Sequence, residues 1–176
     1  MYRVENDVTT GVEQRFDQSE IIVSKTDLKG RITYANEVFI RISGYSEEEL
    51  LGEPHRILRH PGMPRCVFKL LWDRIAEGHE IFAYVVNLCK NGDHYWVFAH
   101  VTPSLDSDGT ITGYHSNRRL PDPAIVSSTI EPLYAQLMEV EKSHSNAKEG
   151  MHAGFAALEQ ILKDQGVSYD EFIFSL

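Results

Sequence analysis

The chain has 176 residues, which is enough for one ordinary domain but too few for two comfortable ones. Its 42% hydrophobic and 24% charged residues are typical of a globular protein and exclude a wholly disordered one. The formal net charge of −9 argues against a nucleic-acid-binding function. The sequence has no apolar run of about 18 residues and does not start like a secretion signal, so we expect a cytoplasmic protein without membrane insertion.

The cysteines and histidines indicate neither a disulfide framework nor a metal site. The two cysteines, Cys66 and Cys89, form no C-x-x-C pair. The eight histidines are scattered, and none forms a close pair at metal-ligand spacing. Charge is uneven along the chain, because residues 1–120 carry 14 basic and 17 acidic side chains whereas residues 121–176 carry 3 and 9. The acidic end is therefore expected to be a separate segment.

The first part of the chain predicts an arm followed by a β-hairpin. Residues 1–19 are polar and weakly patterned, which is typical of a short helix or a loose arm. Residues 21–26 are rich in β-branched side chains and predict a strand. Residues 27–30 have turn chemistry, with a glycine that tolerates positive φ, and residues 31–34 resume the alternation of a strand.

Helical spacing follows between residues 36 and 77. Val38, Phe39 and Ile42 recur at three- and four-residue steps. Ser46 begins another short helix with a capping box. Residues 63–76 place their apolar side chains on one stripe and predict a longer helix that ends at a glycine.

Strands return after residue 80. Residues 81–89, 94–102 and 110–118 predict three strands, joined by turns that each contain Asp and Gly. The order of elements predicts an α+β domain with one five-stranded antiparallel sheet and short helices on one face.

The end of the chain is predicted to be helical. Asp122 and Pro123 suit the N-cap and first position of a helix, while Pro132 should kink this helix or restart it. Residues 148–163 form a second helix, and Ser168 begins a last short one. The apolar stripe of the helix over residues 148–163 needs burial and consists of Met151, Phe155, Leu158 and Leu162. We therefore divide the chain into an arm (1–19), a central domain (20–120), for which the resemblance described next implies a sensor role, and a helical extension (121–176).

The element order carries a family resemblance. Together with Asn36 after the second strand and residues 44–52 (Gly-Tyr-Ser-Glu-Glu-Glu-Leu-Leu-Gly), it resembles a PAS domain. Residues 59–64 (Arg-His-Pro-Gly-Met-Pro) and 90–97 (Lys-Asn-Gly-Asp-His-Tyr-Trp-Val) resemble the sensory PAS domain of Aer-type aerotaxis and energy-taxis receptors, in particular its stand-alone, CetB-like form. The resemblance covers about residues 20–120.

This resemblance implies a domain that holds FAD non-covalently and signals the redox state of the flavin. Carried over position by position, it assigns cofactor contacts to Asn36, Arg59, His60, Phe68, Trp72 and Asn87. The chemistry of these side chains suits a flavin. Amides can hydrogen-bond the pyrimidine edge of the ring, aromatic rings form flat apolar walls, and the basic pair suits a pyrophosphate or the charge gained on reduction.

Most of these residues also have a simpler structural explanation. Phe68 and Trp72 lie four apart on an amphipathic helix, so core packing alone explains them. Asn36 can cap the helix that it precedes, and the Arg-His pair can lie in an exposed turn. Asn87 is harder to explain in this way, because an inward-facing amide in an apolar strand needs a partner.

Two positions depart from the Aer-type pattern. Gly62 stands where those domains usually have an acidic residue. Residues 81–83 (Ile-Phe-Ala) stand where they usually have a Trp-x-Gly pattern. We expect an altered pocket wall in which Phe82 or Tyr84 replaces the missing tryptophan.

The preferred hypothesis is a non-enzymatic redox sensor that signals by contact with a membrane chemoreceptor or another signalling protein, and that forms a homodimer. A haem-binding gas sensor with His60 as axial ligand is one alternative, and a cofactor-free interaction module is another. A light-sensing LOV domain is not expected, because His55 stands where the adduct-forming thiol must be.

Overall fold

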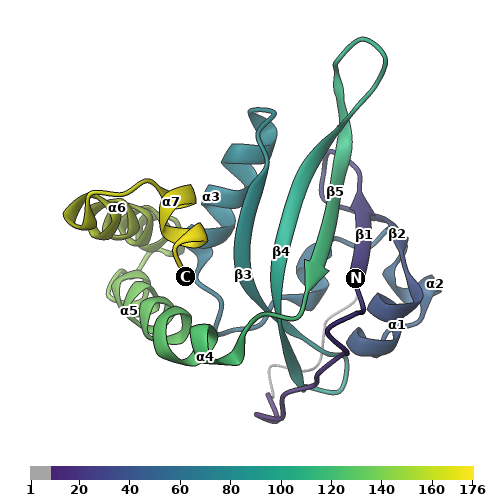
Figure 1. Cartoon of the computed structure of the whole chain (residues 1–176), viewed down its shortest axis with the longest axis horizontal. Helices are drawn as coiled ribbons and strands as arrows, with labels where there is room; N and C mark the ends of the chain where they lie inside the picture. Colours follow the sequence, from purple (N-terminus) through teal and green to yellow (C-terminus); the bar gives the residue numbers. More distant parts are fainter. Residues whose placement is uncertain (1–8) are drawn as a thin grey trace.

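The computed structural model describes residues 9–176, so the part of the predicted arm formed by residues 1–8 lies outside the described residues. Its centre is a five-stranded antiparallel sheet in the order β2-β1-β5-β4-β3 (Figure 1), which confirms the predicted α+β fold. The strands are β1 (Ile22–Thr26), β2 (Ile32–Ala35), β3 (Ile81–Leu88), β4 (His94–Leu105) and β5 (Ile111–Arg119).

The turn between β1 and β2 has the predicted chemistry. The Asp27 carboxylate accepts hydrogen bonds from the backbone N–H groups of Lys29 and Arg31, both at 2.8 Å. Gly30 has a φ of +74°, which side chains with a Cβ rarely adopt. The two strands therefore form the expected hairpin.

The first two helices between β2 and β3 begin at the predicted caps. Asn36 and Ser46 accept hydrogen bonds from the helix amides of Phe39 and Glu49, and Ser46 forms the complete capping box. These helices are α1 (Glu37–Ser43), α2 (Glu47–Leu50), the 3₁₀ turn η1 (His55–Leu58) and α3 (Arg65–Ala76).

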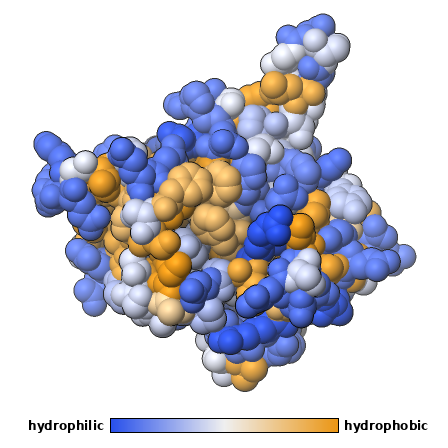
Figure 2. All heavy atoms as spheres, in the orientation of Figure 1, coloured by the Kyte–Doolittle hydropathy of each residue, from blue (hydrophilic) through white to orange (hydrophobic). Residues whose placement is uncertain are grey.

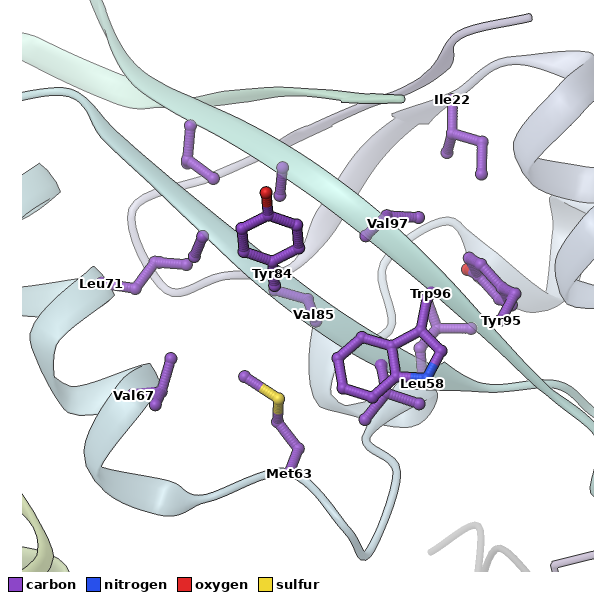
Figure 3. Close-up of a cluster of buried hydrophobic side chains, with 14 of the residues drawn as sticks. Ile22, Leu58, Met63, Val67, Leu71, Tyr84, Val85, Tyr95, Trp96 and Val97 are labelled. Atoms are coloured by element: carbon purple, nitrogen blue, oxygen red, sulfur yellow. The ribbon is translucent and has the colours of Figure 1, made fainter. Parts of the chain in front are cut away.

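Part of the hydrophobic core lies between α3 and one face of the sheet, called the inner face below. Strand alternation places Val85 and Asn87 of β3 on this face, together with Ala99 of β4 and Arg118 of β5. Figure 3 shows Val67 and Leu71 of α3 pointing toward this part of the sheet. The helix thus closes one side of the space in which a ligand site can form.

The end of the chain is helical, as predicted. Pro132 lies in the first turn of α5, directly after a π-helical turn. Proline lacks the N–H donor of an α-helix, so the wide turn before it lets the helix restart there. Among residues 9–176, no helix is both long and apolar enough to cross a bilayer. The helices are α4 (Pro123–Ile125), the π-helical turn η2 (Val126–Ile130), α5 (Glu131–Lys142), α6 (Ala147–Gln165) and α7 (Tyr169–Phe174).

Helices of this extension lie along the edge strand β3 (Figure 1). Two tyrosine hydroxyls donate hydrogen bonds to backbone carbonyls of that strand: Tyr134 to Tyr84 O at 2.5 Å, and Tyr169 to Phe82 O at 2.9 Å. Both hydroxyls satisfy carbonyls that no neighbouring strand reaches, because β3 ends the sheet. The β4–β5 hairpin extends beyond the ends of the neighbouring strands (Figure 1), and it has a hydrophilic tip above a small apolar patch (Figure 2).

Residues 9–19 form an extended arm and contain no helix. The arm pairs with His94, the first residue of β4, through Gln14 N to His94 O at 2.7 Å and His94 N to Val12 O at 2.9 Å. Asp93 holds it in place. Its carboxylate accepts hydrogen bonds from Thr10 Oγ1 at 2.5 Å and Gln14 Nε2 at 2.8 Å.

Replacing Asp93 by Asn should release the arm. The hydrogen bonds hold the pKa of Asp93 below its usual value, so their contribution is present above pH about 4 and is lost as the pH falls through the lowered pKa. In Asp93→Asn, hydrogen exchange at the Gln14 amide should accelerate about tenfold at neutral pH. Asp106→Asn is the control, since Asp106 bonds only backbone amides of its own turn. Equal exchange in the two variants would contradict this role of Asp93.

Candidate cofactor site

A cavity of about 780 Å³ lies between the inner face of the sheet and α3. This volume is within the range of about 300–1,000 Å³ that is typical of small-molecule sites. The strands supply its inner wall, whereas α3 and the segment around η1 supply the opposite side. The predicted cofactor contacts should therefore be among the residues that line this cavity.

Four of the six predicted contact residues line this cavity: Arg59, Phe68, Trp72 and Asn87. Asn87 is 3% exposed, and its Nδ2 donor has no hydrogen-bond partner among the described residues. Arg59 reaches the same place because its backbone forms an antiparallel bridge with Asn87. An unpaired buried amide is costly, so a bound acceptor would be favoured here.

Phe68 and Trp72 form aromatic walls. The guanidinium carbon of Arg59 lies 4.5 Å from the centroid of the Phe68 ring. Trp72 is 37% exposed and meets the ring of Tyr114 edge-on at 5.5 Å. A Cβ on Gly30 would lie 2.8 Å from the indole of Trp72, so the ring can occupy this position only because residue 30 has no side chain. Core packing alone therefore does not explain Trp72, which is partly exposed and lines the cavity.

The structure does not bring Asn36 and His60 to the cavity wall. The Asn36 amide binds backbone only: Oδ1 accepts from Val23 N and Phe39 N, both at 3.0 Å, and Nδ2 donates to the carbonyl of residue 21 at 2.8 Å. His60 Nδ1 accepts from Gly62 N at 3.0 Å. Asn36 and His60 therefore hold the local backbone, whereas the sequence predicts that they contact the cofactor.

The expected replacement of the Trp-x-Gly wall is also not found. Phe82 and Tyr84 alternate with Ala83 and point away from the inner face, so neither lines the cavity. Phe82 instead stacks on His100, with ring centroids 4.1 Å apart. The side chains that complete this wall are the smaller Val85 and Ala99.

Arg118 is a cavity residue that the sequence interpretation missed. It is 2% exposed, donates a hydrogen bond to the hydroxyl of Ser24, and lies over the ring of Phe39 with its guanidinium carbon 4.6 Å from the centroid. Its Nε and Nη1 have no hydrogen-bond partner among the described residues. Burial lowers the pKa of Arg118 to about 10. Alternation along β5 contained the signal, because Arg118 shares a face with Tyr114 and Ser116.

His55 lies beside this buried cation and also lines the cavity. Its ring is stacked with Phe39 at a centroid distance of 6.1 Å. Burial and the charge of Arg118 lower the pKa of His55 to about 3, so its imidazole is neutral at pH 7. Arg118 thus remains the buried charge of this wall.

The lining as a whole is strongly basic although the chain is acidic. Asp73 is its single carboxylate, and it forms an ion pair with Lys69 at 2.5 Å. Charge of one sign around a cleft raises the local concentration of ligands of the opposite sign. The cavity therefore favours an anionic ligand. Its Lys and Arg residues are Lys29, Arg31, Arg56, Arg59, Arg65, Lys69, Arg118 and Lys148.

Comparison with known proteins identifies the class of domain. Residues 32–118 match the family described as the PAS fold. This part of the chain is therefore a PAS domain. The chain is 44% identical to the aerotaxis receptor of Escherichia coli (strain K12) over 117 residues, which are 66% of this chain and 22% of that receptor. The resemblance to the PAS domain of aerotaxis receptors is thereby confirmed.

Other relatives agree with this assignment. The chain is 30% identical over 103 residues to a nitrogen fixation regulatory protein of Klebsiella pneumoniae, covering 58% of this chain and 21% of that protein. It thus spans about a fifth of the length of these curated relatives. Among solved structures, the dark state of the blue-light photoreceptor Aureochrome1 LOV matches with a TM-score of 0.52 and 25% identity, over 70% of this chain and 87% of that one.

Proposed function

We propose that residues 20–120 form a redox sensor domain that binds FAD non-covalently. One observation carries this proposal: the Asn87 amide and the Arg118 guanidinium line a single cavity and have buried N–H donors without a hydrogen-bond partner among residues 9–176. The pyrimidine edge of a flavin offers carbonyl oxygens and ring nitrogens as acceptors. A flavin would therefore satisfy buried donors that the protein leaves unpaired.

The remaining lining also suits FAD. Phe68 and Trp72 offer aromatic faces to a flat ring, and the basic rim offers cations to a diphosphate. When bound, the flavin supplies reversible electron transfer. Asn87 can present either its N–H or its carbonyl oxygen to the ring, and Arg118 stabilises negative charge beside it. Asn36 and His60 would act indirectly, by holding backbone near the site.

A haem-binding site has less support from this geometry. The predicted axial ligand, His60, does not line the cavity, and its Nδ1 is used by the backbone of Gly62. The histidines that line the cavity are His55, His115 and His152. A cofactor-free module would leave three buried donor atoms, Asn87 Nδ2 and Arg118 Nε and Nη1, without partners among the described residues, which costs stability.

The proposed output is protein contact rather than catalysis. We infer that residues 121–176 pass the redox signal to a membrane chemoreceptor or another signalling protein, in the cytoplasm and from a homodimer. The similarity to the aerotaxis receptor supports this role. The docking of α5 and α7 on β3 supplies a physical link between the sensor domain and the extension.

The visible spectrum of the purified protein tests the cofactor. A flavin absorbs at about 450 nm and haem at about 400 nm, and an empty module shows neither band. Strong quenching of flavin fluorescence is expected, because the Trp72 ring faces the site. Trp72→Leu should restore the fluorescence and weaken FAD binding, while the melting temperature of the cofactor-free protein changes little.

Trp96→Leu is the matched control for this variant. Trp96 is buried and does not line the cavity, so its replacement should cost about 3 kcal/mol in both forms and leave the quenching intact. If Trp72→Leu behaves in the same way, Trp72 is a core residue and not a wall of the site.

A further inference from the structure

The cavity has a wall that comes from the helical extension. Lys148, Met151 and His152 of α6 line it together with Arg65 and Phe68 of α3. The helix α6 packs along α3, which also carries Trp72. Residues far apart in the sequence therefore enclose one site, and the extension is part of it.

Glu141, at the end of α5, ties this wall to the sensor domain. Its carboxylate accepts hydrogen bonds from the backbone N–H groups of Arg65 at 3.1 Å and Cys66 at 2.8 Å. The N-cap of α3 is Pro64, which offers no side-chain acceptor, so Glu141 satisfies orphan donors of the first turn. Negative charge at this end also stabilises the helix dipole.

Two glycines of α6 make room for this contact. A Cβ on Gly150 would lie 2.3 Å from the backbone oxygen of Glu141, and a Cβ on Gly154 would lie 2.9 Å from its Cγ. Glu141 is therefore enclosed between α3 and α6. Farther along, Arg74 of α3 forms an ion pair with Asp170 of the extension at 2.8 Å.

We propose that α6 is the outer wall of the ligand site, and that Lys148 contacts the phosphates of an anionic flavin nucleotide. The identity of the ring rests on the function proposed above. Because the ligand touches both the domain and α6, binding of the nucleotide and docking of the extension stabilise each other. The coupling is reciprocal: contacts with α6 that strengthen ligand binding also make the docked position of α6 more stable by the same free energy when the ligand is bound.

The test compares riboflavin and FAD on the full chain. Riboflavin has the ring without phosphates, so it measures the ring site alone. Lys148→Met should weaken FAD binding about tenfold, which is typical of one charge-assisted contact, and leave riboflavin binding unchanged. Lys163→Met is the control, because Lys163 is an exposed lysine of the same helix that does not line the cavity.

A second variant tests the coupling without touching the ligand. Glu141→Ala should weaken FAD binding several-fold because α6 is released. Removing a carboxylate near a basic cavity would by itself strengthen anion binding, so the expected sign separates coupling from simple electrostatics. Glu139→Ala, an exposed carboxylate on α5, should bind FAD like the wild type.

Hydrogen exchange of residues 147–165 supplies a readout other than affinity. FAD should protect α6 more than riboflavin does in the wild type, and this difference should disappear in Glu141→Ala. If riboflavin binds but FAD neither binds more tightly nor protects α6, this inference is overturned and the ring site stands. If no flavin binds, the proposed function fails and this inference fails with it.

Discussion

Replacing Arg118 by methionine is expected to raise the melting temperature of the cofactor-free protein and to remove most of its stabilisation by flavin. The buried guanidinium has two donor groups without partners among the described residues, so an apolar side chain of similar length relieves a desolvation cost. The expected gain is about 1–4 kcal/mol. The same change removes a charge-assisted contact to the ligand, which should weaken FAD binding by a factor of about 10–100.

Thermal melts with and without FAD check both effects in one experiment. Arg119→Met is the control, since Arg119 is the exposed neighbour on the other face of β5 and should change neither melt. If Arg118→Met and Arg119→Met lower the melting temperature of the cofactor-free protein by the same amount, the Arg118 guanidinium has a structural role.

The stability difference between Arg118→Met and the wild type should depend on pH with a defined sign. Burial lowers the pKa of Arg118 to about 10 in the folded protein, below its usual value. Deprotonation is then easier in the folded than in the unfolded chain, so the cost of the buried charge declines as the pH rises through about 10. The stability advantage of Arg118→Met should therefore shrink above that pH.

Asn87→Ala is expected to release FAD or to shift its midpoint potential by a few tens of millivolts. Flavin reduction changes the hydrogen bonding at the ring, and an amide can reverse which group it presents. For a two-electron couple, 30 mV corresponds to about 1.4 kcal/mol, which is the size of one good hydrogen bond. Because the Asn87 Nδ2 donor has no hydrogen-bond partner in the described part of the chain, the cofactor-free protein should lose little stability.

Flavin content and a redox titration measure these outcomes. Asn117→Ala serves as the control, because Asn117 is a half-buried amide on the outer face of β5. Unchanged flavin content together with an unchanged potential in Asn87→Ala would rule out a contact between Asn87 and the ring.

Local chemistry made much of the fold predictable. Alternation, the turn at Gly30 and the capping residues Asn36 and Ser46 each act over a few positions, so their consequences could be derived from neighbouring residues. Asn87 is the site residue for which the same reasoning worked. An amide within an apolar strand needs a partner wherever the strand is buried.

The rest of the site depends on contacts between distant segments. Arg118 follows a polar stretch of β5, and a charged residue near a strand end is usually exposed. Alternation along β5 gives the face on which Arg118 lies, but its burial follows from the packing of Phe39 and Ser24 against it. Lys148 lies more than sixty positions from the predicted contact residues, so no local pattern places it at the cavity.

The two tyrosine hydroxyls on β3 have a consequence for any fragment of this protein. A strand at the end of a sheet exposes carbonyl and amide groups that can template pairing with another polypeptide. Tyr134 and Tyr169 occupy two of those carbonyls in β3, and the helices that carry them cover the strand. A fragment cut near residue 120 would bare this edge and invite self-association. The oligomeric state of such a fragment would then result from the loss of the helices that cover β3, and it would not indicate how the intact chain assembles.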